Sequence, residues 1–209
     1  LAAMLDGTES IAGIDVDTDL RWLILGQLSE EGHADAALIQ ATMAADPSDI
    51  GQRRGMACLA ARPTVAAKEE AWQRVVDATA PVPKAWKGAA DGELSIASMA
   101  AILRGFYVGS VGVGGMMSHG PNPELLRPYV ERYLDALPAM WAERTIDEAE
   151  AFTECLYPNN LVDDQVVAAI DLALENGELP GPAIRILREG RDGTLRAQRA
   201  REVDRAAGA

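Results

Sequence analysis

Short segments with helical spacing of apolar residues recur along the whole chain, each between a residue that can cap a helix and a glycine or proline that can end one. In the first clear example Asp17 or Thr18 can act as the cap, and Leu20, Ile24 and Leu28 fall on one side of the segment. Runs of β-branched residues are scarce and aromatic residues make up only 5% of the chain, which favours helix packing over a sheet. The sequence therefore predicts an all-α fold.

Similar start and stop signals divide the rest of the chain. Ser48 and Thr64 can each cap a following helix, and Thr145 with Glu148 has the spacing of a capping box. Either Asp163 or Asp164 can begin another helix, which Gly177 closes. Two breaks are also predicted, at Pro138 and, within the arginine-rich last helix, at Gly190 or Gly193.

The predicted helices recur in pairs, about thirty to forty residues apart, without a strict sequence repeat. A pair of short helices cannot bury its apolar faces alone and stacks on the next pair. A closed four-helix bundle would use fewer and longer helices. The pattern therefore favours one helical domain over residues 1–209, built as a superhelical stack of antiparallel helix pairs, an α-solenoid of the HEAT or armadillo kind.

Charge and apolar patterning restrict the partners of the chain. The formal net charge of −13 argues against nucleic acid, because neutralising phosphates needs a clustered basic face. The sequence has no eighteen-residue apolar run, no signal peptide and no lipidation motif, so no membrane partner and a cytoplasmic location are expected. Cys58 and Cys155 lie in apolar helical segments and are expected to be buried free thiols.

Motifs for catalysis or metal binding are missing from the sequence. The HExxH zinc motif needs two histidines four residues apart on a helix, whereas His33 and His119 are far apart in the chain. No P-loop, convincing dinucleotide fingerprint or GxSxG nucleophile elbow is present. We therefore expect no catalytic residue, no metal ligand and no cofactor in this chain.

Arginines concentrate near the end of this otherwise acidic chain, between positions 185 and 205. Guanidinium groups bind carboxylates and carbonyl oxygens, so the cluster is suited to peptide contacts. The same residues could instead form a solvent-facing helix surface paired with the neighbouring acidic residues Glu189, Asp192, Glu202 and Asp204.

A set of landmarks in a fixed order carries a family resemblance. They are VDTDLRW at 16–22, AAKEEAW at 66–72, ELSIAS and then GF at 93–106, LLRPYVERYLDALPAMW at 125–141, RTIDEAE at 144–150, LYP at 156–158 and the closing REGRDGTLRAQRAREVD. Together they resemble the C-terminal helical domain of actinobacterial-type aminopeptidase N, a gluzincin family of zinc aminopeptidases. The endoplasmic-reticulum aminopeptidases carry a related domain.

The resemblance implies a role within a larger enzyme. In that family an upstream catalytic domain holds the zinc and grips the substrate amino terminus, so this chain would be a non-catalytic fragment of a multidomain peptidase. It would close over the catalytic domain of the same polypeptide and line the chamber that admits peptide substrates. Arg185, Arg188 and Arg196 are the candidate substrate contacts that follow.

Two points stay open at this level. A stand-alone α-solenoid that binds another protein along its groove would show the same helical pattern. Residues 109–122, which include His119, are longer than the matching connection in the family and are expected to be a connector.

Overall fold

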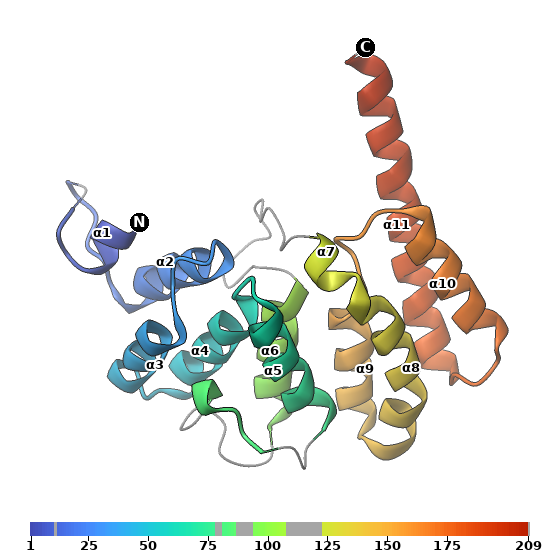
Figure 1. The fold of residues 1–209 in the computed structure, drawn as a ribbon, viewed down its shortest axis with the longest axis horizontal. Helices are drawn as coiled ribbons and strands as arrows, with labels where there is room; N and C mark the ends of the chain where they lie inside the picture. Colours follow the sequence, from blue (N-terminus) through green and yellow to red (C-terminus); the bar gives the residue numbers. More distant parts are fainter. Residues whose placement is uncertain (11, 78–80, 87–93, 108–122, 209) are drawn as a thin grey trace. The chain divides into compact units, whose positions relative to one another are not determined.

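The computed structural model describes residues 1–10, 12–77, 81–86, 94–107 and 123–208. These residues form α-helices and one 3-10 helix and contain no β-strand (Figure 1), which confirms the predicted all-α fold. The elements are α1 (Ala2–Leu5), α2 (Thr18–Glu30), α3 (Ala36–Ala45), α4 (Asp49–Ala61), α5 (Val65–Val76), η1 (Lys84–Trp86), α6 (Ile96–Tyr107), α7 (Pro123–Leu126), α8 (Pro128–Glu143), α9 (Ile146–Cys155), α10 (Asp164–Glu175) and α11 (Gly181–Ala207).

Side-chain caps begin most of the longer helices at the predicted places. The caps of α2 and α10 are Asp17 and Asp163, and each side chain accepts a hydrogen bond from a backbone N–H three residues further on. At α9 both hydrogen bonds of the capping box form between Thr145 and Glu148. The caps satisfy backbone N–H groups that have no partner inside the helix, so these starts are decided locally.

Two predicted breaks are wrong. α8 continues through Pro138, which removes one backbone hydrogen bond, while Leu137 before it and Met140 after it remain buried. α11 continues through Gly190 and Gly193. Gly190 faces the ring of Tyr157, where a Cβ atom would come within 2.5 Å of a ring carbon. This glycine therefore serves packing against a neighbouring segment and does not end the helix.

Contacts between Cα atoms group the chain into two units, Leu1–Leu125 and Leu126–Ala209. In the first unit α4 is central and packs against α2, α3, α5 and α6 (Figure 1). Gly105 of α6 lies directly against the backbone of α4, and a Cβ atom there would come within 2.2 Å of the Ala57 carbonyl oxygen. The absence of a side chain at this position allows the close approach of the two helices.

The core of the first unit contains a buried lysine. Lys68 of α5 has no exposed surface, and its Nζ donates hydrogen bonds to the carbonyl oxygens of Ala60 at 2.6 Å and Phe106 at 2.7 Å, with Gly105 at 3.5 Å. These carbonyls belong to the last turns of α4 and α6. Burial lowers the pKa of Lys68 to about 7, so a single ammonium group joins the ends of two helices at an electrostatic cost.

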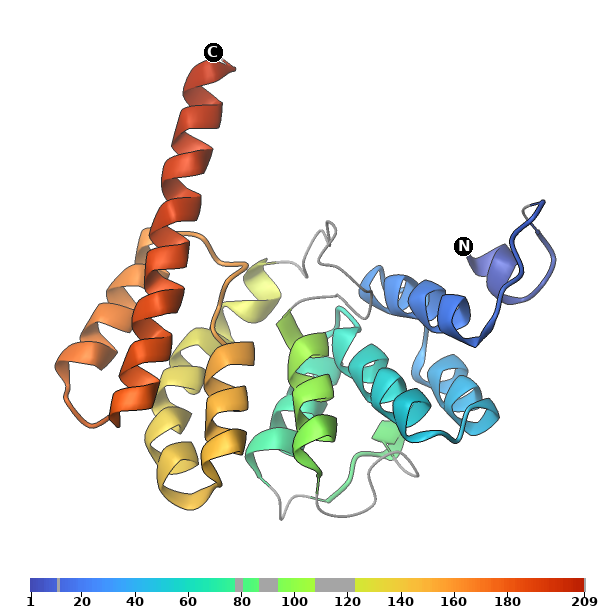
Figure 2. The ribbon, with the colours of Figure 1, turned by 180° about the vertical axis from the view of Figure 1, so that it is seen from behind.

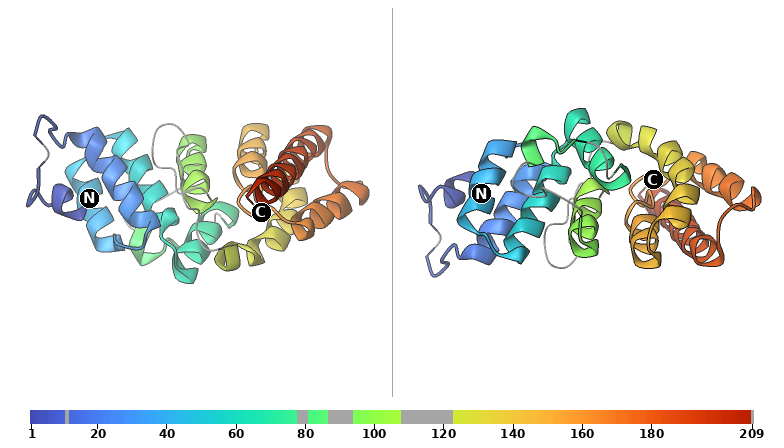
Figure 3. Two further views of the ribbon diagram at one scale, coloured as in Figure 1. Left: turned by 90° about the horizontal axis from the view of Figure 1, so that it is seen from above. Right: turned by 90° about the horizontal axis from the view of Figure 1, so that it is seen from below.

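The second unit consists of two helix hairpins, α8 with α9 and α10 with α11. α8 also packs against α10, and α9 against α11. The view from behind and the views from above and below show these helices side by side (Figures 2 and 3). Buried polar groups tie α8 to α9: the Tyr133 hydroxyl donates to the Thr153 carbonyl oxygen at 2.8 Å. The last turns of α11 extend past the other helices of this unit (Figure 2).

Within the described residues, no helix is both long and apolar enough to cross a membrane. Cys58 is a buried free thiol, as predicted, and burial raises its pKa to about 12. Cys155 is only partly buried, which differs from the predicted burial. Of the two histidines, His33 is exposed, whereas His119 and the predicted connector 109–122 lie outside the described residues.

Candidate functional site

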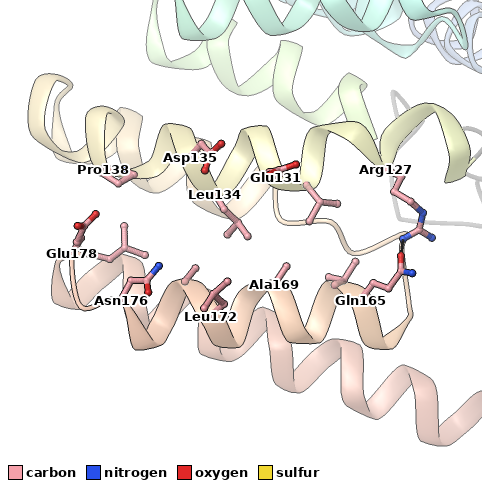
Figure 4. A pocket seen from close by; sticks show the side chains of 14 residues that line it. Arg127, Glu131, Leu134, Asp135, Pro138, Gln165, Ala169, Leu172, Asn176 and Glu178 are labelled. Atoms are coloured by element: carbon pink, nitrogen blue, oxygen red, sulfur yellow. Dashed lines mark hydrogen bonds between the residues drawn. The ribbon is translucent and has the colours of Figure 1, made fainter.

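In the second unit a groove of about 580 Å³ lies between α8 and α10. Side chains of the two helices face each other across it, with Glu178 at one end and Arg127 beside Gln165 at the other (Figure 4). Its lining is Arg127, Val130, Glu131, Leu134, Asp135 and Pro138 from α8 and the residue before it, and Gln165, Val166, Ala169, Leu172, Ala173, Asn176, Glu178 and Leu179 from α10 and the turn after it.

Helical periodicity produces the groove. The lining positions of α8 recur at intervals of three and four residues, and so do those of α10, so each set forms one stripe on its helix. Leu134 on α8 is only half-buried, and Leu172 on α10 keeps 60% of its surface exposed. The apolar floor of the groove is therefore open to solvent.

Carboxylates dominate the charge of the groove. Glu131, Asp135 and Glu178 are exposed, whereas the cation among the lining residues, Arg127, donates to Asp163 at 2.8 Å and to Gln165 at 2.9 Å. Burial acts to raise the pKa of Asp163, but the hydrogen bonds from Arg127 and from backbone N–H groups outweigh it and hold that pKa below its ordinary value. The ion pair compensates Arg127, so the groove as a whole is negative.

The lining of the groove is suited to binding. In the described part of the chain no group of three or more His, Cys, Asp or Glu side chains is placed to hold a metal ion. Zinc therefore has no fitting ligand set among these residues. What the groove offers is an apolar floor with a charged rim, a combination typical of sites for peptides and small molecules.

Comparison with known proteins assigns the family. The family model described as "ERAP1-like C-terminal domain" matches residues 1–196. The chain belongs to this family. It is also 34% identical over 207 residues to an aminopeptidase N from Streptomyces lividans, an alignment that covers 99% of this chain and 21% of that protein. The chain thus spans about a fifth of the length of that relative, and the predicted family resemblance is confirmed.

In this ERAP1-like C-terminal domain the three predicted substrate contacts lie on the exposed face of α11. Arg185 forms an ion pair with Glu189 at 3.2 Å and Arg196 one with Asp192 at 3.1 Å. Arg188 is exposed on the same face. None of these three arginines is among the described residues that line the α8/α10 groove. The structure brings them together on one helix surface, and their contact with substrate stays a prediction.

Another arginine of the cluster has a structural partner that sequence reasoning missed. Arg191 makes a two-pronged ion pair with Asp171 of α10, and its Nη2 lies 2.8 Å from a carboxylate oxygen. The hydrogen bond from Arg191 holds the pKa of Asp171 below its ordinary value. The pair joins α11 to α10, and its two members are too far apart in sequence for a local pattern to reveal it.

A smaller hollow of about 330 Å³ lies between α4 and α6 of the ERAP1-like domain, lined by Ile50, Arg53, Arg54, Ala57, Ala97, Ala101 and Arg104. Two of its guanidinium groups are already paired, Arg53 with Asp49 and Arg54 with Asp19. These two ion pairs compensate two of the three guanidinium charges that line this hollow. The α8/α10 groove, which is larger and carries uncompensated carboxylates, is the stronger candidate site.

Proposed function

We propose that this chain is the non-catalytic C-terminal domain of a zinc-dependent aminopeptidase N, which removes N-terminal residues from peptides. The family match over residues 1–196 carries the proposal. The aminopeptidase N from Streptomyces lividans supports it, because four-fifths of that protein lie outside the alignment and leave room for a catalytic domain.

In this proposal the chain contributes binding surface and the rest of the polypeptide contributes catalysis. The zinc would be held by the catalytic domain of the same polypeptide. This chain would close over that domain and line the chamber that peptides enter. A wall of packed helices suits this role, since it excludes folded proteins while offering a broad surface to a flexible peptide.

We further propose that the two units act as one C-terminal domain with solenoid stacking. Alternate helices pack on each other in both units: α2 on α4, α4 on α6, α8 on α10 and α9 on α11. This is the contact pattern of stacked helix pairs. We place the parent enzyme in the cytoplasm, and the buried free thiol of Cys58 agrees with a reducing compartment.

The first test is the complete polypeptide encoded together with this chain, checked by the intact mass of the native protein. We expect an upstream HExxH motif followed by a further glutamate that completes the zinc site. The purified polypeptide should contain zinc and release N-terminal residues from peptides. A native protein that begins near Leu1 and hydrolyses no peptide would refute the proposal and leave the stand-alone protein-binding scaffold, which the open groove would serve.

The second test concerns the arginines of α11. In the parent enzyme, replacing Arg185, Arg188 and Arg196 by alanine should raise KM for long peptides but not for a single-residue amide substrate that cannot reach beyond the catalytic domain. Arg201, which helical spacing puts on the opposite side of α11, supplies the matched alanine control. Unchanged peptide kinetics in the triple variant would remove these arginines from the substrate path.

A further inference from the structure

The α8/α10 groove exposes apolar surface that the fold itself does not cover. Leu172 is 60% exposed, and Leu134 and Leu179 beside it are only half-buried. Six lining positions run from Arg127 to Pro138, which at 1.5 Å per residue is a length of about 16 Å. About five residues of an extended peptide fit along this distance.

The rim of the groove, formed by the carboxylates of Glu131, Asp135 and Glu178, favours positively charged ligands. Glu131 and Asp135 stand one turn apart on α8, and Glu178 closes one end (Figure 4). Within the described residues none of these three carboxylates has an ion-pair partner, while Arg127 is held by Asp163. Three carboxylates along an apolar channel attract cations and repel anions.

We propose that the groove binds an extended peptide segment in which lysine or arginine side chains alternate with apolar ones. The apolar side chains would cover Leu134 and Leu172, and the cationic side chains would pair with the carboxylates of the rim. A peptide carboxylate or an acidic side chain would meet like charges instead. Only the identity of the bound segment, as part of a substrate of the parent enzyme, rests on the proposed function.

The test is a binding measurement on the 209-residue chain, independent of catalysis. The probe is a fluorescein-labelled heptapeptide of alternating lysine and leucine, followed by fluorescence anisotropy. We expect saturable binding at 20 mM NaCl that weakens at 300 mM NaCl because salt screens the rim charges. A peptide with glutamate in place of lysine, and one with serine in place of leucine, should each bind at least tenfold more weakly.

Neutralising the rim tests the site. The variant with Glu131→Gln, Asp135→Asn and Glu178→Gln keeps the shape of the groove and should weaken binding of the lysine–leucine peptide roughly five- to tenfold, as expected for three exposed charge pairs. The matched control removes three exposed carboxylates outside the groove, by Glu143→Gln, Glu154→Gln and Glu202→Gln. It changes the net charge by the same amount and should alter the affinity less than twofold.

Several outcomes would overturn the inference. They are absence of peptide binding, equal weakening by both triple variants, and equal binding of the lysine and glutamate peptides. Self-association of the chain that is lost in the rim variant would assign the groove to a second copy instead. These results leave the proposed function standing, because the release of N-terminal residues by the parent enzyme is measured separately. Conversely, peptide binding to a chain with no peptidase upstream would refute the proposed function alone.

Discussion

Substituting Lys68 by methionine keeps a side chain of similar length in the core of the first unit and removes every hydrogen bond that Nζ donates. The carbonyl oxygens of Ala60 and Phe106, at 2.6 and 2.7 Å from Nζ, would then lack this donor in a buried site. An unsatisfied buried carbonyl costs about 1–3 kcal/mol. This loss is partly offset, because the variant no longer carries the free-energy cost of burying a charged ammonium group. The balance of the two effects depends on pH.

The sign of the pH dependence follows from the direction of the pKa shift. Burial lowers the pKa of Lys68 from 10.5 to about 7 in the folded state. Between these values the unfolded chain binds more protons than the folded chain, so the free energy of unfolding rises with pH. The slope is about 1.4 kcal/mol per pH unit, which amounts to roughly 2 kcal/mol between pH 7 and pH 9. Below pH 7 both states are protonated and this gain is absent.

Lys68→Met lacks this gain, so its destabilisation relative to the unaltered protein should grow by roughly 2 kcal/mol from pH 7 to pH 9. Urea unfolding followed by tryptophan fluorescence measures it, since Trp22, Trp72 and Trp86 all lie in the first unit. Other groups titrate equally in both proteins and cancel in the difference. Lys84→Met, at an exposed lysine, is the matched control and should show no such trend.

A difference between Lys68→Met and the unaltered protein that stays constant from pH 6.5 to pH 9 would refute the reasoning. It would mean that the carbonyl oxygens hold Lys68 as an ammonium group throughout, in spite of its burial.

Three further predictions concern packing, capping and thiol reactivity. Gly190→Ala should destabilise the protein by about 1–3 kcal/mol, because its Cβ atom would meet the Tyr157 ring, whereas Gly193→Ala, with open space around it, should be neutral or stabilising in the same thermal unfolding assay. Glu148→Ala should cost about 1 kcal/mol at pH 7. The cost should shrink in urea unfolding at pH 3, since hydrogen bonding in the capping box lowers the pKa of Glu148 and that contribution is lost as pH falls through the lowered pKa. A disulfide-exchange reagent should label Cys58 only upon unfolding, because burial raises its thiol pKa to about 12; rapid labelling of Cys58 in the native protein, located by peptide mass analysis to separate it from the partly buried Cys155, would contradict this.

Local chemistry made the helix starts predictable. A side-chain oxygen at Ser48, Thr64 or Thr145 reaches backbone N–H groups only three residues away, so the relevant partners are adjacent in sequence. Sequence left two such choices open, Asp17 or Thr18 and Asp163 or Asp164, and the structure uses the first residue of each pair as the cap. The family was likewise predictable from the sequence, because the resemblance depends on motifs and on their order along the chain.

The candidate site was not predictable in the same way. Leu134 and Leu172 belong to helices about forty residues apart, and the groove between them exists only because α8 packs against α10. The predicted arginines Arg185, Arg188 and Arg196 were chosen by charge alone, and their surroundings on α11 depend on how that helix packs.

The sequence by itself determined the helical class, most helix starts and the family, because capping and periodicity act within a few residues. Tertiary structure decided which residues share a groove, which arginine pairs with Asp171, and why α8 continues through Pro138 and α11 through Gly190. The physical reason is that burial and charge pairing join residues distant in sequence. A proline or glycine breaks a helix only where packing does not compensate for it.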